Sequence, residues 1–228
     1  MKTNKAWTIT KINFSHLKLV YIITGLAVLA GGYNLFEFLT YEYRPHIEFV
    51  DCANYVYLAV ILAAVFIPAV NFKRIMHLNG KRLGFYWGAL LNYVMIAATA
   101  SLLNIVLFEL FQSLFGSKLV IYNLIEIFGW INHGVLLAFF QQFFFLLLLA
   151  VAIHTFTSMQ TFRIGWAVDI AIIAVISVFT PIPMLRGALI WFFDTIIYQD
   201  VAVQIISCIV LTAGLYALYL PILQRKTI

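Results

Sequence analysis

Charged residues are scarce in this chain of 228 residues, and their scarcity excludes a soluble fold. Asp, Glu, Lys and Arg together make up 10% of the sequence, whereas soluble globular domains carry about 25%. Hydrophobic residues reach 64% and the mean hydropathy is +1.00. Too few polar side chains remain to build a surface that faces water. The composition therefore predicts a polytopic membrane protein.

Motifs for catalysis and nucleotide binding are also missing. The sequence has no G-x-x-x-x-G-K-[ST] loop, no H-E-x-x-H motif and no G-x-S-x-G elbow. The only two cysteines, Cys52 and Cys208, lie far apart, which gives no support for a disulfide or a thiolate metal site. We therefore expect neither an enzyme nor a bound cofactor or metal.

Six apolar runs are present, each near or above the length that crosses a bilayer as a helix. They cover residues 19–39, 54–72, 87–112, 134–153, 165–185 and 201–221. The first run is too long for the apolar part of a signal peptide and lacks a convincing cleavage site, so we interpret it as a retained helix. The predicted fold class is all-α, with a single transmembrane domain over residues 1–228.

The distribution of basic residues predicts the orientation, because cytoplasmic loops carry an excess of Lys and Arg. If each of the six runs crosses the membrane, eleven basic residues lie on one side and only Arg44, Lys118 and Arg186 lie on the other. The eleven are Lys2, Lys5, Lys11, Lys18, Lys73, Arg74, Lys81, Arg82, Arg163, Arg225 and Lys226. We therefore expect a multi-pass protein of the cell membrane with both termini in the cytoplasm.

Two further apolar segments are ambiguous. Residues 119–131 are too short to cross and contain Glu126. Residues 184–200 follow Pro181 and Pro183, and counting them as a span would give seven crossings and an external C-terminus. An even number of crossings keeps Arg225 and Lys226 on the cytoplasmic side. This favours a re-entrant or interfacial hairpin over residues 181–200 on the outer side.

The segment before the first span mixes aromatic residues with lysines over residues 5–18. Trp7 and Phe14 among Lys5, Lys11 and Lys18 are typical of a helix that lies along lipid headgroups. The alternative is a basic flank that only sets orientation.

The connection between the second and third spans reads NFKRIMHLNGKRLGFYWGALL over residues 71–91. Asn79 and Gly80 can form a turn between two short helical pieces, and apolar residues lie between two basic pairs. Exposed apolar side chains would serve as anchors in a groove on a partner protein, with the basic residues as a charged rim. Glycines at positions 80, 84 and 88 would allow close backbone approach. An ordinary positive-inside loop explains the same residues equally well.

This layout resembles the membrane subunit of an ABC-2-type ABC transporter over the whole chain. That family has an elbow helix before the first of six spans, similar to residues 5–18. Its cytoplasmic coupling helix corresponds to residues 73–86, where NGKRLGFYWGALL carries the similar pattern, and its re-entrant hairpin corresponds to residues 181–200.

The resemblance implies a permease that exports cargo such as an amphipathic peptide, an antimicrobial compound or a lipid-like molecule. A separate ABC ATPase subunit would hydrolyse ATP, and a second permease copy or a related chain would complete the pathway in the lipid bilayer. It implies no nucleic acid. The residues expected to contact the ATPase are Lys73, Arg74, Ile75, Met76, Leu78, Gly80, Lys81 and Arg82.

Uncharged polar residues within the spans are candidates for lining a pathway. They are Asn92, Thr99, Asn104, Gln141 and Gln142. Hydrogen bonds that join neighbouring helices explain the same residues and are the commoner role.

Two other functions are compatible with the hydropathy. A six-span substrate-binding subunit of a vitamin uptake transporter would have a compact, polar, outward-facing pocket and no coupling loop. A membrane enzyme would gather several titratable residues in one cavity.

Overall fold

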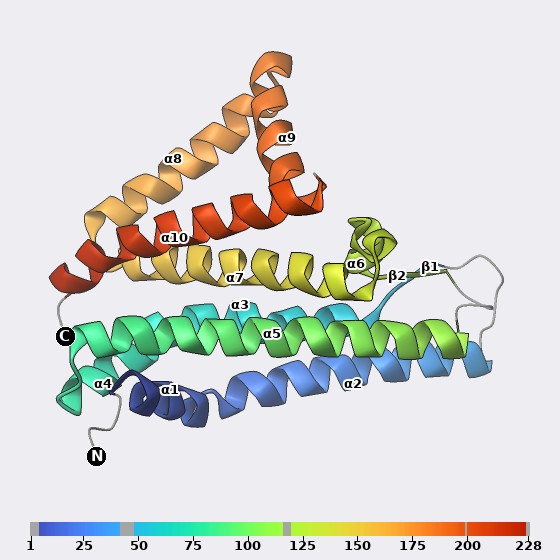
Figure 1. Ribbon diagram of the computed structural model, residues 1–228, viewed down its shortest axis with the longest axis horizontal. Helices are drawn as coiled ribbons and strands as arrows, with labels where there is room; N and C mark the ends of the chain where they lie inside the picture. Colours follow the sequence, from blue (N-terminus) through green and yellow to red (C-terminus); the bar gives the residue numbers. More distant parts are fainter. Residues whose placement is uncertain (1–4, 42–47, 116–119, 199, 227–228) are drawn as a thin grey trace.

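The computed structural model describes residues 5–41, 48–115, 120–198 and 200–226. Lys2, Arg44 and Lys118, which contribute to the predicted orientation, lie outside these ranges. Within them the chain consists of helices, short connections and a parallel pair of three-residue strands, β1 (Glu48–Val50) and β2 (Val120–Tyr122). Long helices run side by side, and both ends of the chain lie at the same end of the bundle (Figure 1).

The helical elements follow one another along the chain with short connections. They are α1 (Lys5–His16), α2 (Lys18–Tyr41), η1 (Cys52–Val56), α3 (Tyr57–Phe66), the π-helix η2 (Ile67–Asn71), α4 (Phe72–His77), α5 (Arg82–Phe115), α6 (Leu124–Ile127), η3 (Trp130–His133), α7 (Val135–Met159), α8 (Arg163–Phe179), α9 (Pro183–Ile197) and α10 (Val201–Arg225).

Four of the described helical stretches are long and apolar enough to cross a membrane. They are Cys52–His77, Arg82–Leu114, Val135–Met159 and Val201–Arg225. Two bent pairs, α1 with α2 (51°) and α8 with α9 (118°), raise the number to six if each pair is one span. The predicted helical class is confirmed, the described helices are compatible with a multi-pass membrane protein, and six crossings is the upper end of this range.

The expected fifth span is shorter than its apolar run. The run continues to residue 185 in the sequence, but α8 ends at Phe179 and α9 begins at Pro183. Ile182, the residue before Pro183, has the extended backbone (φ −92°, ψ 113°) that a following proline favours, and Pro183 begins the new helix, where a proline fits best. Figure 1 shows α8 and α9 as a V that stands away from the other helices.

The second span contains a wide turn. The π-helix η2 begins next to Pro68, and the N–H of Phe72 donates to the carbonyl of Ile67 five residues earlier. Such a turn inserts one extra residue into an otherwise α-helical span. As a result α3, η2 and α4 form one continuous helical stretch from residue 57 to residue 77.

The turn between α4 and α5 forms at Asn79 and Gly80, as predicted. Asn79 has a left-handed backbone (φ 56°), and the N–H of Gly80 donates to the carbonyl of Ile75 at 2.9 Å. The expectation of two short helical pieces is wrong for the second piece, because helix α5 begins at Arg82 and continues for 34 residues. The turn therefore connects two spans directly.

Helix α1 packs closely against α5 at two of the predicted glycines. A Cβ atom on Gly88 would lie 2.8 Å from Cγ2 of Ile9 and 3.0 Å from the carbonyl oxygen of Ala6. On Gly84 it would lie 3.0 Å from Cδ1 of Ile9. The expected close approach to the α5 backbone is confirmed at these two glycines, and the helix that approaches it is α1.

The described part of the segment 119–131 forms no helix long enough to cross a membrane, as expected. It forms β2, α6 and the start of η3 at the end of the bundle opposite the chain termini (Figure 1). The buried carboxylate of Asp51 fastens this region, because it accepts hydrogen bonds from the N–H of Ala53 (2.9 Å) and from Nδ2 of Asn123 (2.7 Å).

We expect Gly88→Leu to lower the free energy of unfolding by about 1–3 kcal/mol, because the added side chain must displace α1. The measurement is thermal unfolding of the purified protein in detergent. Gly214→Leu is the control, since a Cβ atom there meets no atom within 4 Å. Equal midpoints for the two variants would contradict the contact.

Candidate functional site

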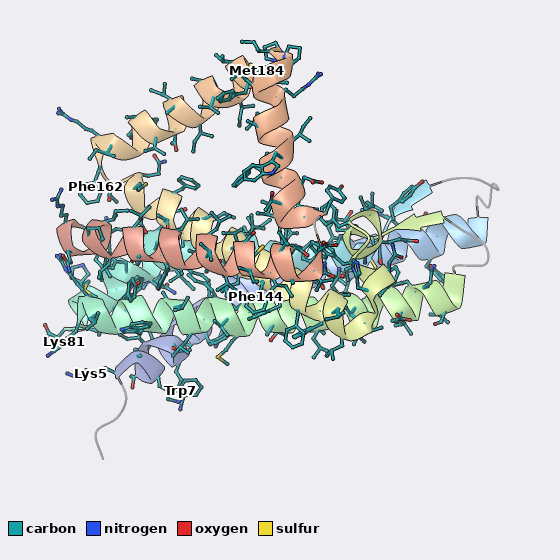
Figure 2. All side chains as sticks on the ribbon, turned by 45° about the horizontal axis from the view of Figure 1, so that its top comes forward. Lys5, Trp7, Lys81, Phe144, Phe162 and Met184 are labelled. Carbon is teal, nitrogen blue, oxygen red and sulfur yellow. The ribbon has the colours of Figure 1, made fainter. Side chains whose placement is uncertain are left out.

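The exposed basic surface at the end that carries both termini is the first candidate site. It is the turn formed by residues 73–82, which we call the α4–α5 tip. Lys73, Arg74, His77, Leu78 and Lys81 are exposed on it. Figure 2 shows Lys81 near Lys5 and Trp7 of α1 at the same end of the bundle. The tip and α1 therefore present a common surface.

Only one of the three expected apolar anchors is available on this surface. Leu78 is 69% exposed, whereas Ile75 and Met76 are 2% and 8% exposed. The expectation that Ile75 and Met76 are exposed is wrong, because α4 is helical and its i, i+3, i+4 positions share one face. That face, which begins at Phe72, packs into the core with Phe85.

Arg82 binds within the chain. Its guanidinium donates to the carbonyl oxygens of Leu223 (3.3 Å), Gln224 and Lys226 (2.9 Å). The first two carbonyls belong to the last turn of α10 and have no partner inside the helix, and that of Lys226 follows directly after the helix. A cation there also complements the helix dipole. Arg82 is therefore a cap that joins α5 to α10, and its expected place in the exposed rim is wrong.

Lys226 is a second basic residue that binds inside the protein. It is 3% exposed, its Nζ donates to the carbonyl of Pro68 at 2.8 Å, and it lies 4.9 Å from the centre of the Phe72 ring. Burial, and then the positive charge of Lys73, lower its pKa from 10.5 to about 8. This lysine fixes the end of the chain to the wide turn η2.

Asn92, a predicted pathway residue, joins helices. Its Oδ1 accepts a hydrogen bond from Nδ2 of Asn13 (2.8 Å), and its own Nδ2 donates to the carbonyl of Thr10 (3.2 Å). Asn13 also accepts from Asn71 at 3.1 Å. All three asparagines are buried, so they connect α1, η2 and α5 and do not face an open pathway.

The glutamine pair has the same role. Gln141 donates to Oε1 of Gln204 at 2.6 Å, and Gln142 donates to the hydroxyl of Tyr57 at 2.5 Å. These bonds connect α7 with α10 and with α3. Asn104 is buried, and neither polar atom of its side chain has a partner among the described residues. The interhelical role thus accounts for Asn92, Gln141 and Gln142, and pathway lining stays a prediction for Thr99 and Asn104.

A groove between α2 and α5 is the second candidate site. It has a volume of about 480 Å³ and extends over the start of α3. Thr24 and Gly25 of α2 line one wall, and Ile96, Thr99 and Leu103 of α5 line the other. We call it the α2–α5 groove. Its walls are almost entirely apolar, so it suits an apolar chain.

A buried tyrosine–histidine cluster was not predicted. His154 is 0% exposed, and its Nδ1 shares a hydrogen bond of 2.5 Å with the hydroxyl of Tyr93. Tyr219 lies edge-on to the imidazole, with ring centres 4.2 Å apart, and Tyr86 donates to the carbonyl of Tyr216. The cluster joins α5, α7 and α10. The spacing of Tyr86 and Tyr93 by seven residues was the available signal.

The chain matches no known family model, no curated protein and no solved structure. Its function must therefore be inferred from the residues and contacts above.

We expect Asn92→Leu to destabilise the protein by about 1–3 kcal/mol, because it leaves the buried Nδ2 of Asn13 without its acceptor. Thr99→Val, at an exposed position, should change stability by no more than about 0.5 kcal/mol. Thermal unfolding in detergent measures both, and the reverse order of effects would assign Asn92 to a water-filled pathway.

The buried Lys226 gives a pH dependence with a definite sign. Its pKa in the folded protein, about 8, is below its ordinary value of 10.5, so the unfolded chain binds more protons between these values. Stability should therefore rise as the pH is raised from about 8 to about 10.5. Unfolding midpoints at pH 7, 8.5 and 10 measure this rise, and Lys226→Met should reduce it. Identical pH profiles for the two proteins would contradict the burial of this charge.

Proposed function

We propose that this chain is the membrane subunit of an ABC-2-type exporter that moves amphipathic or lipid-like cargo while a separate subunit hydrolyses ATP. The observation that carries the proposal is the α4–α5 tip, which exposes Leu78 among Lys73, Arg74 and Lys81 at the end that carries both termini. An apolar side chain within a charged rim is the usual pattern of an anchor for a partner protein.

The tip is built to transmit force to two spans. On one side α4 continues the second span, and on the other α5 begins at Arg82. The buried Ile75 and the bond from Gly80 to its carbonyl hold the turn between them. A push by an ATPase against Leu78 would thus tilt α3–α4 and α5 together.

Helix α1 supports the role of an elbow. It meets α2 at 51°, packs against α5, and leaves Trp7 46% exposed with Nζ of Lys11 5.6 Å from its ring centre. An aromatic ring beside lysines is suited to the headgroup layer. Because α1 is bonded to α5 through Asn13 and Asn92, it would move with the tip.

The α8–α9 pair provides apolar surface for a second permease chain. Ile173 of α8 and Trp191 of α9 are 64% and 67% exposed, and the pair bends by 118°. In this proposal α9 is the re-entrant arm on the outer side, and two such chains enclose one pathway. Both termini are then cytoplasmic.

The vitamin-binding alternative has less support. A pocket of about 150 Å³ near the end opposite the termini includes Tyr57 and Gln142 in its lining. Their polar groups bind each other, and the other lining residues are aliphatic or aromatic. A subunit that captures a vitamin needs polar groups that are free to bind it.

The test is capture of the ATPase from native membranes. We expect Leu78→Ser to reduce the amount of co-purifying ABC ATPase at least about tenfold, because a central apolar anchor contributes about 2 kcal/mol or more to an interface and about 1.4 kcal/mol corresponds to a factor of ten. Mass spectrometry identifies and quantifies the ATPase. Leu78→Met, which keeps an apolar side chain, should retain it.

Ile75→Ser separates binding from folding. Because Ile75 is 2% exposed, this variant should lower the unfolding midpoint, whereas Leu78→Ser should leave it unchanged. Full retention of the ATPase by a folded Leu78→Ser variant would refute the coupling role of the tip.

A further inference from the structure

The α2–α5 groove exists because α2 is held at its start and again near its middle. At its start α1 fixes it to α5. Near its middle Gly31 lies so close to η1 that a Cβ atom would be 2.6 Å from the ring of Tyr55 and 2.8 Å from Cβ of Cys52. Between these contacts the helices separate and leave about 480 Å³. Gly25 lines this space, and a Cβ atom there would meet nothing within 4 Å.

The face of α2 that borders the groove changes in polarity along its length. Lys18, Tyr21, Gly25 and Leu29 follow one another at helical spacing, so they share one face of α2. Lys18 is exposed at the end of this face nearest α1, while Gly25 and Leu29 line the groove. One face thus carries a positive charge at one end and an apolar surface along the rest.

Thr24 adds a polar group between the charge and the apolar part. Its side chain lines the groove and is 8% exposed, and its Oγ1 has no hydrogen-bond partner among the described residues. A buried threonine in a helix usually bonds to the carbonyl four residues earlier, and a hydroxyl without any partner is costly. Thr24 lies about 9 Å along the axis from Lys18. Its hydroxyl is therefore an unsatisfied donor in the wall of the groove.

We propose that the groove binds an acidic phospholipid, with the phosphate at Lys18, an ester carbonyl at Thr24 and one acyl chain along Gly25, Leu29 and Leu103. The order of charge, hydroxyl and apolar wall matches the order of phosphate, ester and hydrocarbon in such a lipid. Lys11 and Arg74 are exposed on neighbouring elements at the same end, which favours an anionic headgroup. The site does not depend on the ATPase.

A helix from a second copy is the other candidate occupant of this space. An apolar helix would cover the apolar walls but would leave the exposed Lys18, Lys11 and Arg74 at one end without an anion. The positive charge at that end therefore favours the lipid.

The test uses native mass spectrometry of the full chain in detergent, titrated with palmitoyl-oleoyl phosphatidylglycerol or with phosphatidylcholine of the same chains. We expect one phosphatidylglycerol to bind at least tenfold more tightly than phosphatidylcholine. Gly25→Leu fills the groove without a clash and should weaken this binding at least tenfold. Gly32→Leu, in the same helix and also in open space, is the matched control and should bind as the unaltered chain does.

Two polar variants test the headgroup end. Lys18→Gln should remove the preference for phosphatidylglycerol, and Thr24→Val, which keeps the shape, should weaken the binding of both lipids. Equal affinity of the unaltered chain for both lipids would overturn the proposal. The proposal would also be overturned if Gly25→Leu bound phosphatidylglycerol as tightly as the unaltered chain does. If Gly25→Leu changed the oligomeric state but not the lipid binding, the groove would be assigned to a second copy.

Discussion

The contact between α1 and α5 positions the rest of the candidate surfaces. It combines a steric element, the absence of side chains at Gly84 and Gly88, with a polar one, the bond between Asn13 and Asn92. Inside a bilayer the hydrophobic effect does not hold helices together, so close packing and interhelical hydrogen bonds must do so. This contact sets where α2 begins, and thereby opens the groove beside it. It also places α1 next to the α4–α5 tip.

The basic residues at the end of the bundle that carries both termini belong to two populations. Arg82 and Lys226 bind backbone carbonyls of other elements and fasten the bundle. Lys73, Arg74 and Lys81 remain exposed and are available to a partner or to lipid headgroups. The positive-inside rule counts both populations alike, because it acts during membrane insertion, before side chains acquire their folded partners.

Local signals predicted the helical class, the Asn79–Gly80 turn and the small-residue face of α5, because each depends on a few neighbouring residues. Side-chain partners could not be predicted in the same way. Arg82 binds carbonyls more than 140 residues away, and Tyr93 meets His154 across 61 residues. Ile75 and Met76 had the composition of an exposed anchor, but the helical phase of α4 turned them inward. Pairing across distant segments and the rotation of a helix about its axis are not encoded in a short window of sequence.

That rotation has its origin in the wide turn at Pro68. Each residue of an α-helix advances the direction of its side chain by about 100°, so the extra residue in η2 resets the phase of everything that follows it in the second span. A regular helix there would shift each following side chain by one helical position, so that one of the adjacent pair Ile75 and Met76 would leave the interior and a neighbour, Arg74 or His77, would enter it. One surplus residue near the middle of a membrane helix thus decides which side chains the protein offers to its surroundings at the helix's far end.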